Sequence, residues 1–347
     1  MKKSDVVDLI KYHVDKNNVA FKQKALEIAD EFKAMGDIDI GSYINSLLAT
    51  QGVFVPQEIH YSFKYLHQVS DLNKTVFKLP DSIYDDLRGI MNAINRNNGI
   101  NKFLFVGKPG TGKTESVKVI SKILNKTIYK VDFDSVIDSR LGQTAKNISE
   151  LFNEINNIPY PEKVIVLMDE IDAIALDRIS SNDIREMGRA TTAVLKGLDE
   201  LNSNIILIAT TNLYKYLDDA LSRRFNLIVN FNQYSTSDLM DVAVAIMNDI
   251  YKDTDYKISR NIKLFKKIVG LYDDKIPLPG NLNNVIRTTV AFSDPNDPND
   301  YLVRLYKAVS GEKMNISQLS EEGFTLREIG ILTGKSKSSV ARILEDK

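Results

Sequence analysis

The octapeptide GKPGTGKT, residues 107–114, decides the fold class of this chain. It matches the pattern G-x-x-x-x-G-K-[ST] between an apolar run, Lys102 to Val106, and a segment of helical character, Thr111 to Leu124. Glycines let backbone N–H groups curl around phosphate oxygens, and the helix N-terminus adds partial positive charge. The loop therefore predicts a nucleoside triphosphate site, with ATP as the expected nucleotide. The expected contacting residues are Gly107, Pro109, Gly110, Thr111, Gly112, Lys113 and Thr114.

Side chains in and beyond this loop have the chemistry that hydrolysis needs. Lys113 is expected to reach the β- and γ-phosphates, and the Thr114 hydroxyl to coordinate Mg²⁺. The apolar run Val164 to Met168 ends in Asp169 and Glu170, which a parallel sheet would place at the same edge as the loop. Asp169 is predicted to hold Mg²⁺, and Glu170 to orient and deprotonate the attacking water.

Two later segments extend the predicted site. A further apolar run, Ile205 to Ala209, leads to Asn212, whose amide can donate and accept hydrogen bonds and so position the water. Arg223 and Arg224 follow at a predicted helix end. Arginine there can stabilise charge that develops on the transferred phosphoryl group.

Strand and helix signals alternate from Asp81 to Asn230, which predicts an α/β fold with a parallel sheet covered by helices. Helical spacing alone marks both ends of the chain. The expected domains are an N-terminal helical domain (1–55), an α/β nucleotide domain (70–235), a helical lid (236–292) and separate C-terminal helices (301–347). The N-terminal helices fit an adaptor or oligomerisation role.

Four segments, in order, resemble the AAA+ ATPases, in particular the AAA branch: GKPGTGKT, VIVLMDEID (164–172), ATTN (209–212) and LDDALSRRF (217–225). The resemblance covers residues 70 to about 290. It implies that Asn212 is the sensor-1 residue and that Arg223 or Arg224 is an arginine finger acting on a neighbouring subunit's nucleotide. It also implies a homo-oligomer, usually a ring or spiral of six subunits. Which arginine is the finger stays open.

The segment 137–155 is similar to the family stretch that carries the central pore loop. Protein-threading members have an aromatic residue where this chain has Arg140, followed by Leu141 and Gly142. An arginine there suits an acidic segment or a nucleic-acid backbone, and an ordinary exposed arginine fits equally well. The lid segment 278–288 looks like the sensor-2 region, but no arginine directly follows Gly280 and Arg287 receives no nucleotide role.

The last helices, residues 316–345, resemble the helix-turn-helix of resolvases and related regulators. Leu319, Ile329, Leu332 and Val340 would close a three-helix core, and Gly334 would provide the tight turn. The third helix is expected to begin near Lys337. Its DNA-binding side chains would be Lys335, Ser336, Lys337, Ser338 and Arg342. A protein-docking module is the alternative interpretation.

Composition limits the remaining possibilities. The formal net charge of -1 excludes a chain that binds nucleic acid by overall charge, so any such contact must be local. No cysteine is present, and no apolar run approaches the length of a bilayer span. A cytoplasmic location without membrane insertion is expected.

Three functions follow as hypotheses. The first is an oligomeric ATPase that remodels a protein or protein–DNA target. The second is a DNA-bound switch controlled by ATP. The third is an unfoldase that serves a separate protease, a partner suggested by the likeness of the N-terminal region to bacterial AAA proteins encoded beside subtilisin-like proteases.

Overall fold

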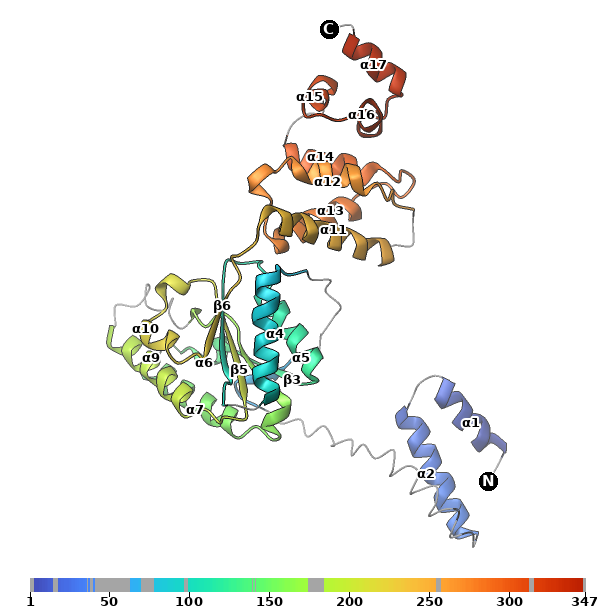
Figure 1. Ribbon diagram of the computed structural model, residues 1–347. Coiled ribbons are helices and arrows are strands. Elements are labelled where there is room, and N and C mark those ends of the chain that lie inside the picture. The colour runs from blue at the N-terminus through green and yellow to red at the C-terminus, as the bar shows by residue number, and fades with distance from the viewer. Residues whose placement is uncertain are drawn as a thin grey trace. The chain divides into compact units, whose positions relative to one another are not determined.

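The computed structural model (Figure 1) describes residues 3–14, 18–35, 37, 40, 63–69, 78–96, 99–138, 140, 142–173, 184–253, 257–311 and 315–345. The chain divides into two compact units, Met1–Ser62 and Phe63–Lys347. Each unit is described by itself.

Among the described residues of the first unit, two helices are resolved, α1 (Lys3–Val14) and α2 (Asn18–Ala34), in the region where helical spacing predicts them. They pack together through the buried residues Ala25, Ile28 and Ala29. Asp5 is also buried, and it forms an ion pair with Lys24 at 3.2 Å. A polar, glutamine-containing stretch at residues 49–57 suggests a link to the next domain, and it lies outside the described residues.

A six-stranded sheet forms the base of the second unit, in the order β1-β3-β4-β5-β2-β6. Five strands are parallel, so the prediction of a mostly parallel sheet is confirmed. The sixth, β1, pairs antiparallel with β3 at one edge and was not predicted from the sequence. The strands are β1 (Leu66–Gln68), β2 (Lys102–Val106), β3 (Thr127–Val131), β4 (Val164–Met168), β5 (Ile206–Thr211) and β6 (Leu227–Asn230).

Helices cover both faces of this sheet (Figure 1) because side chains alternate along each strand. Phe103 and Phe105 of β2 point into a core with α4 and α5, whereas Leu104 and Val106 point into the opposite core with α7 and α9. All five residues of β4 are buried, as expected for a central parallel strand. The described helices between β1 and β6 are α4 (Asp81–Arg96), α5 (Lys113–Leu124), α6 (Phe133–Val136), α7 (Gln143–Asn156), α9 (Ile184–Asp199) and α10 (Asp219–Ser222).

Seven further helices follow the sheet, and they share one apolar core. The core joins the expected lid to the C-terminal helices: Tyr306 stacks edge-on against Phe324, and the Lys267 ammonium donates to Gly323 O at 2.6 Å and to Glu328 Oε2 at 3.0 Å. The last helices are therefore not separate in packing, and a domain boundary between 292 and 301 stays a prediction. These helices are α11 (Thr236–Asp253), α12 (Ile262–Gly270), α13 (Pro279–Ala291), α14 (Asp300–Ser310), α15 (Ile316–Glu321), α16 (Leu326–Thr333) and α17 (Lys337–Glu345).

Within the part of the chain that the structure describes, no helix combines the length and apolar character that crossing a membrane requires.

Candidate nucleotide site

The loop 107–112 joins β2 to α5 and has the backbone that only glycine adopts readily. Gly112 has φ 93° and precedes the first residue of α5. At position 107 only glycine fits, for a steric reason: a Cβ there would lie 2.9 Å from Cβ of Phe231. The loop therefore has the tight course over the helix N-terminus that a phosphate cradle requires.

Lys113 is buried, and its ammonium group has three acceptors in the site. Nζ donates to Gly107 O at 2.7 Å, to Lys108 O at 3.0 Å and to Asn212 Oδ1 at 2.7 Å. Burial lowers the pKa of Lys113, and the nearby carboxylates of Asp169, Asp172 and Glu170 oppose that shift. The ammonium group of Lys113 is thus held beside the loop by three oxygen acceptors. Phosphate oxygens of a bound nucleotide can replace the two carbonyl acceptors.

Asp169 lies at the carboxyl end of β4, where its two oxygens have different partners. Oδ1 accepts from Thr114 Oγ1 at 2.9 Å and from Thr210 Oγ1 at 2.8 Å, while Oδ2 accepts from Lys130 Nζ at 2.7 Å. Burial alone would raise the pKa of Asp169, but the hydrogen bonds from Lys130, Thr210 and Thr114 hold it below its ordinary value. The carboxylate stays ionised, as a metal ligand must.

Sequence reasoning missed Lys130 and Thr210, although both contact Asp169. Each lies in a strand next to β4: Lys130 in β3 and Thr210 in β5. Strand order alone could have suggested them, since a polar residue near the carboxyl end of a neighbouring strand lies beside the acids. Asp172 was also missed. It is buried, and among the described residues its Oδ1 has no hydrogen-bond partner.

Glu170 follows Asp169 in a strained backbone conformation, with φ 58°. A left-handed residue other than glycine costs on the order of 1–2 kcal/mol. Two hydrogen bonds to Thr210 hold Glu170 in this conformation. Glu170 N donates to Thr210 Oγ1 and Ile171 N donates to Thr210 O, each at 2.9 Å. The exposed Glu170 carboxylate accepts from Asn212 Nδ2 at 3.2 Å. Asn212 therefore bridges Lys113 and Glu170.

The two arginines after α10 differ in their partners. Arg224 is half-buried and tied to its own chain: Nη1 donates to Ala220 O at 2.7 Å and Nη2 pairs with Asp199 at 3.2 Å. Arg223 is exposed, and its side chain has no hydrogen bond or ion pair within the described part of the chain. Among the described residues, neither arginine side chain makes a hydrogen bond or ion pair with the loop 107–114.

The helices after β6 touch the phosphate-binding loop directly. Gly280, at the start of α13, donates its N–H to Gly110 O at 2.8 Å, and a Cβ on Gly280 would lie 2.9 Å from Gly110 Cα. The Tyr234 hydroxyl donates to Thr111 O at 2.9 Å. Arg287, left without a nucleotide role above, instead pairs with Asp249 of α11 at 2.9 Å.

The remaining predicted residues lie apart from this cluster. Arg140 is exposed, with 84% of its side-chain surface accessible, and Gly142 caps α7 with φ 77°. Leu141 lies outside the described residues. The suggested DNA-contacting residues Lys335, Ser336, Lys337, Ser338 and Arg342 are all exposed, before and along α17. Gly334 ends α16 with φ 69°, as the tight turn requires.

Comparison with known proteins agrees with this geometry. Residues 103–233 match the model of the ATPase family associated with various cellular activities (AAA). The chain carries an AAA ATPase domain. This AAA domain implies that the chain binds ATP.

Relatives of the AAA domain come from several kinds of organism. An uncharacterized AAA family ATPase of Sinorhizobium fredii is 35% identical over 132 residues, which are 38% of this chain and 39% of that protein. A putative 26S proteasome regulatory subunit homolog of Methanothermobacter marburgensis is 29% identical over 169 residues, which are 48% of this chain and 45% of that protein. The chain thus spans less than half of the length of these two curated relatives.

One solved structure, that of the E. coli MS115-1 HORMA:CdnC:Trip13 complex, includes a chain with a similar fold. The TM-score is 0.54 at 17% sequence identity, and the alignment covers 73% of this chain and 96% of that chain. At this identity the likeness concerns the fold alone.

Proposed function

We propose that this chain hydrolyses ATP with the help of Mg²⁺, acts as an oligomer, and remodels a protein or protein–DNA target. The observation that carries the proposal is the bridge that Asn212 makes between Lys113 and Glu170. It joins the group that would hold the γ-phosphate to the group that would deprotonate water, so binding and hydrolysis share one cluster.

The residues present suit ATP and its metal. Loop glycines offer backbone N–H groups, Lys113 offers a mobile cation, and Thr114 and Asp169 offer the hard oxygen donors that Mg²⁺ prefers. When bound, Mg²⁺ would neutralise charge on the β- and γ-phosphates. Glu170 would accept the proton of the attacking water, and Asn212 would hold that water in line.

A neighbouring subunit is proposed to complete each site. Arg224 already has partners in its own chain, whereas Arg223 is exposed. We therefore assign the arginine finger to Arg223, which would reach the nucleotide of the next subunit. The oligomer is expected to be a ring or spiral, usually of six subunits by the AAA resemblance.

A protein target is favoured by the relative named as a putative 26S proteasome regulatory subunit homolog. That name describes the relative. For this chain, the exposed Arg140 in place of an aromatic residue counts against threading of a polypeptide into a separate protease.

The test uses Glu170→Gln, with Glu200→Gln as the matched control at an exposed carboxylate of the same domain. The Glu170 variant should bind ATP with near-normal affinity, lose turnover by about 10²- to 10⁴-fold, and persist as an ATP-dependent oligomer in light scattering. Normal turnover by this variant, or an oligomeric state that ignores ATP, would refute the proposal.

DNA binding by α17 is the second candidate function, favoured by the exposure of its basic residues while Glu328 and Phe324 face the lid. The exposed surface of α17 can then meet a duplex without disturbing the shared core. Lys335→Glu/Lys337→Glu should weaken duplex binding and reduce its salt dependence. Unchanged affinity at several salt concentrations would exclude this function.

A further inference from the structure

A groove of about 610 Å³ lies between α7 and α9, away from the nucleotide cluster. The two helices lie side by side (Figure 1) and approach closely near the end of α9, where a Cβ on Gly197 would lie 2.1 Å from the Phe152 ring. Further along, Ala145, Gly188 and Ala193 line the groove and leave it open. A Cβ on Gly188 would have no atom of the described residues within 4 Å.

Three cations line this groove: Lys146 from α7, and Arg189 and Lys196 from α9. Among the described residues that line it, none is acidic and none is aromatic. Lys196 has an exposed partner, Glu200, at 3.8 Å, and ion pairs between exposed side chains contribute little to stability. Such a weak pair leaves the ammonium group available to a ligand.

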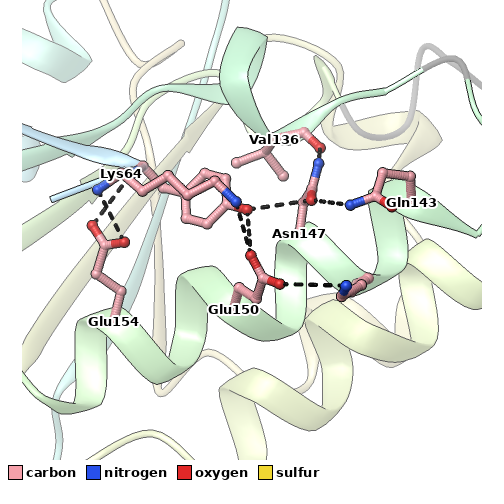
Figure 2. Close-up of polar contacts among 8 residues, drawn as sticks. Lys64, Val136, Gln143, Asn147, Glu150 and Glu154 are labelled. Atoms are coloured by element: carbon pink, nitrogen blue, oxygen red, sulfur yellow. Dashed lines mark hydrogen bonds and ion pairs between the residues drawn. The ribbon is translucent and has the colours of Figure 1, made fainter.

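The partner of Lys146 is already neutralised by a different cation. Glu150 Oε2 accepts from Lys64 Nζ at 2.9 Å and from the Tyr65 hydroxyl at 2.8 Å, whereas Lys146 is 3.9 Å from Oε1 (Figure 2). One carboxylate therefore serves two lysines. The excess positive charge falls on Lys146, at the groove.

The same network holds α7 in place. Asn147 accepts from Gln143 Nε2 at 2.8 Å and from the Tyr65 hydroxyl at 3.2 Å, and it donates to Val136 O at 2.9 Å (Figure 2). These bonds connect α7 to Tyr65, the residue before β1, and to the last residue of α6. Because α7 is held in place before a ligand binds, less conformational entropy is lost on binding.

We propose that the α7–α9 groove binds an acidic polypeptide segment of the remodelled target. Carboxylates match the two lysines and the forked guanidinium of Arg189. The absence of aromatic side chains among the described lining residues disfavours single-stranded nucleic acid, which binds largely by base stacking. The inference rests on the proposed protein-remodelling function and names its substrate class.

The experiment measures fluorescence anisotropy of a labelled glutamate-rich peptide, and of its glutamine counterpart, on the full-length chain without nucleotide. Lys146→Glu/Lys196→Glu should weaken binding of the acidic peptide at least about tenfold and reduce its salt dependence. A charge-matched control, Lys263→Glu/Lys307→Glu at exposed positions of α12 and α14, should leave binding unchanged. All of these variants should keep the basal ATP turnover of the natural chain.

A second pair of variants changes the shape of the groove without changing its charge. Gly188→Leu should fill the groove and weaken binding of the acidic peptide, while Gly188→Ala should leave that binding intact. Peptide binding that survives both Lys146→Glu/Lys196→Glu and Gly188→Leu would overturn the inference, as would preference for a single-stranded oligonucleotide of equal charge. If the natural chain itself showed no ATP turnover, that result would instead count against the proposed function.

Discussion

The ammonium group of Lys113 lies 2.7 Å from the amide oxygen of Asn212, two residues that are 99 positions apart in the sequence. The other end of that amide donates to Glu170 at 3.2 Å. A γ-phosphate that takes Lys113 would release one end of Asn212. The amide is thus placed to couple the arrival of a nucleotide to the position of the Glu170 carboxylate.

Asn212→Ala should therefore affect turnover more than binding. Lys113 keeps the carbonyl oxygens of Gly107 and Lys108, so ATP affinity should change by less than about threefold, whereas kcat should fall by about 10- to 100-fold. Nucleotide titration and steady-state phosphate release measure the two effects. Asn153→Ala, at an exposed position of α7, is the control. Equal losses of affinity and kcat would contradict the role given to Asn212.

Lys130→Met should increase the affinity of the nucleotide-free site for Mg²⁺. Its ammonium group holds Asp169 Oδ2 at 2.7 Å, and a divalent cation must displace it or share the carboxylate. Removing this competitor should tighten Mg²⁺ binding by about threefold to tenfold, since a charged hydrogen bond is worth about 1.5–3 kcal/mol before solvent exposure is discounted. Thermal unfolding with increasing Mg²⁺ and no nucleotide gives the measurement. Lys130→Arg should behave like the natural chain, and weaker metal binding by the Met variant would refute competition.

Arg223→Ala should affect ATP turnover, whereas Arg224→Ala should affect the free energy of unfolding. The first should lower turnover by about 10³-fold or more with unchanged stability, because an arginine finger acts on the transition state. The second should lower the free energy of unfolding by about 1 kcal/mol through loss of the Asp199 and Ala220 contacts.

Subunit mixing tests whether the finger acts between chains. Arg223→Ala subunits combined with Lys113→Ala subunits should regain part of the ATPase activity, because each supplies what the other lacks. No recovery in the mixed oligomer would mean that Arg223 acts within one chain or not at all.

Glu328→Gln should destabilise the C-terminal helices in a pH-dependent way. Burial raises the pKa of Glu328, but bonds from Thr325 and Lys267 more than offset this and bring it below its ordinary value of 4.5. The carboxylate therefore contributes its full stability above that ordinary value and loses it as the pH falls through the lower folded-state pKa.

Denaturation at neutral pH should show a loss of about 1–2 kcal/mol for Glu328→Gln, and the difference from the natural chain should shrink in acid. Glu321→Gln, at an exposed position of α15, is the control. A difference that persists in acid would mean that the ion pair with Lys267 is not its source.

Most of the fold could be predicted because its signals are local. The fully buried run of β4 and the glycine-rich loop each specify an element within a few residues. Strand β1 was missed because three residues carry too little periodicity, and only pairing with β3 makes it a strand. The packing of the C-terminal helices on the lid was also missed. It depends on contacts such as Lys267 with Glu328, 61 residues apart.

The candidate site divides in the same way. Lys113, Thr114, Asp169 and Glu170 are visible in short motifs, and the structure brings them together with Asn212. Lys130 and Thr210 lack a motif, so their contacts with Asp169 emerge only from the strand order. The ion-pair partner of Arg224, Asp199, likewise comes from a helix 25 residues away in the sequence, and this pair distinguishes Arg224 from Arg223.

The shared core of the lid and the last three helices has a practical meaning for how this molecule can be dissected. A chain cut at Gly311 would lose Phe324 and Leu319 from that core and bare Tyr306 and Leu305 to water. Burial of one such side chain is worth about 1.5–3 kcal/mol, so the shortened protein would risk aggregation for reasons unrelated to ligands. A ligand of α17, as proposed above, would therefore be bound by a helix that shares its core with α13, and α13 contacts the phosphate-binding loop at Gly110.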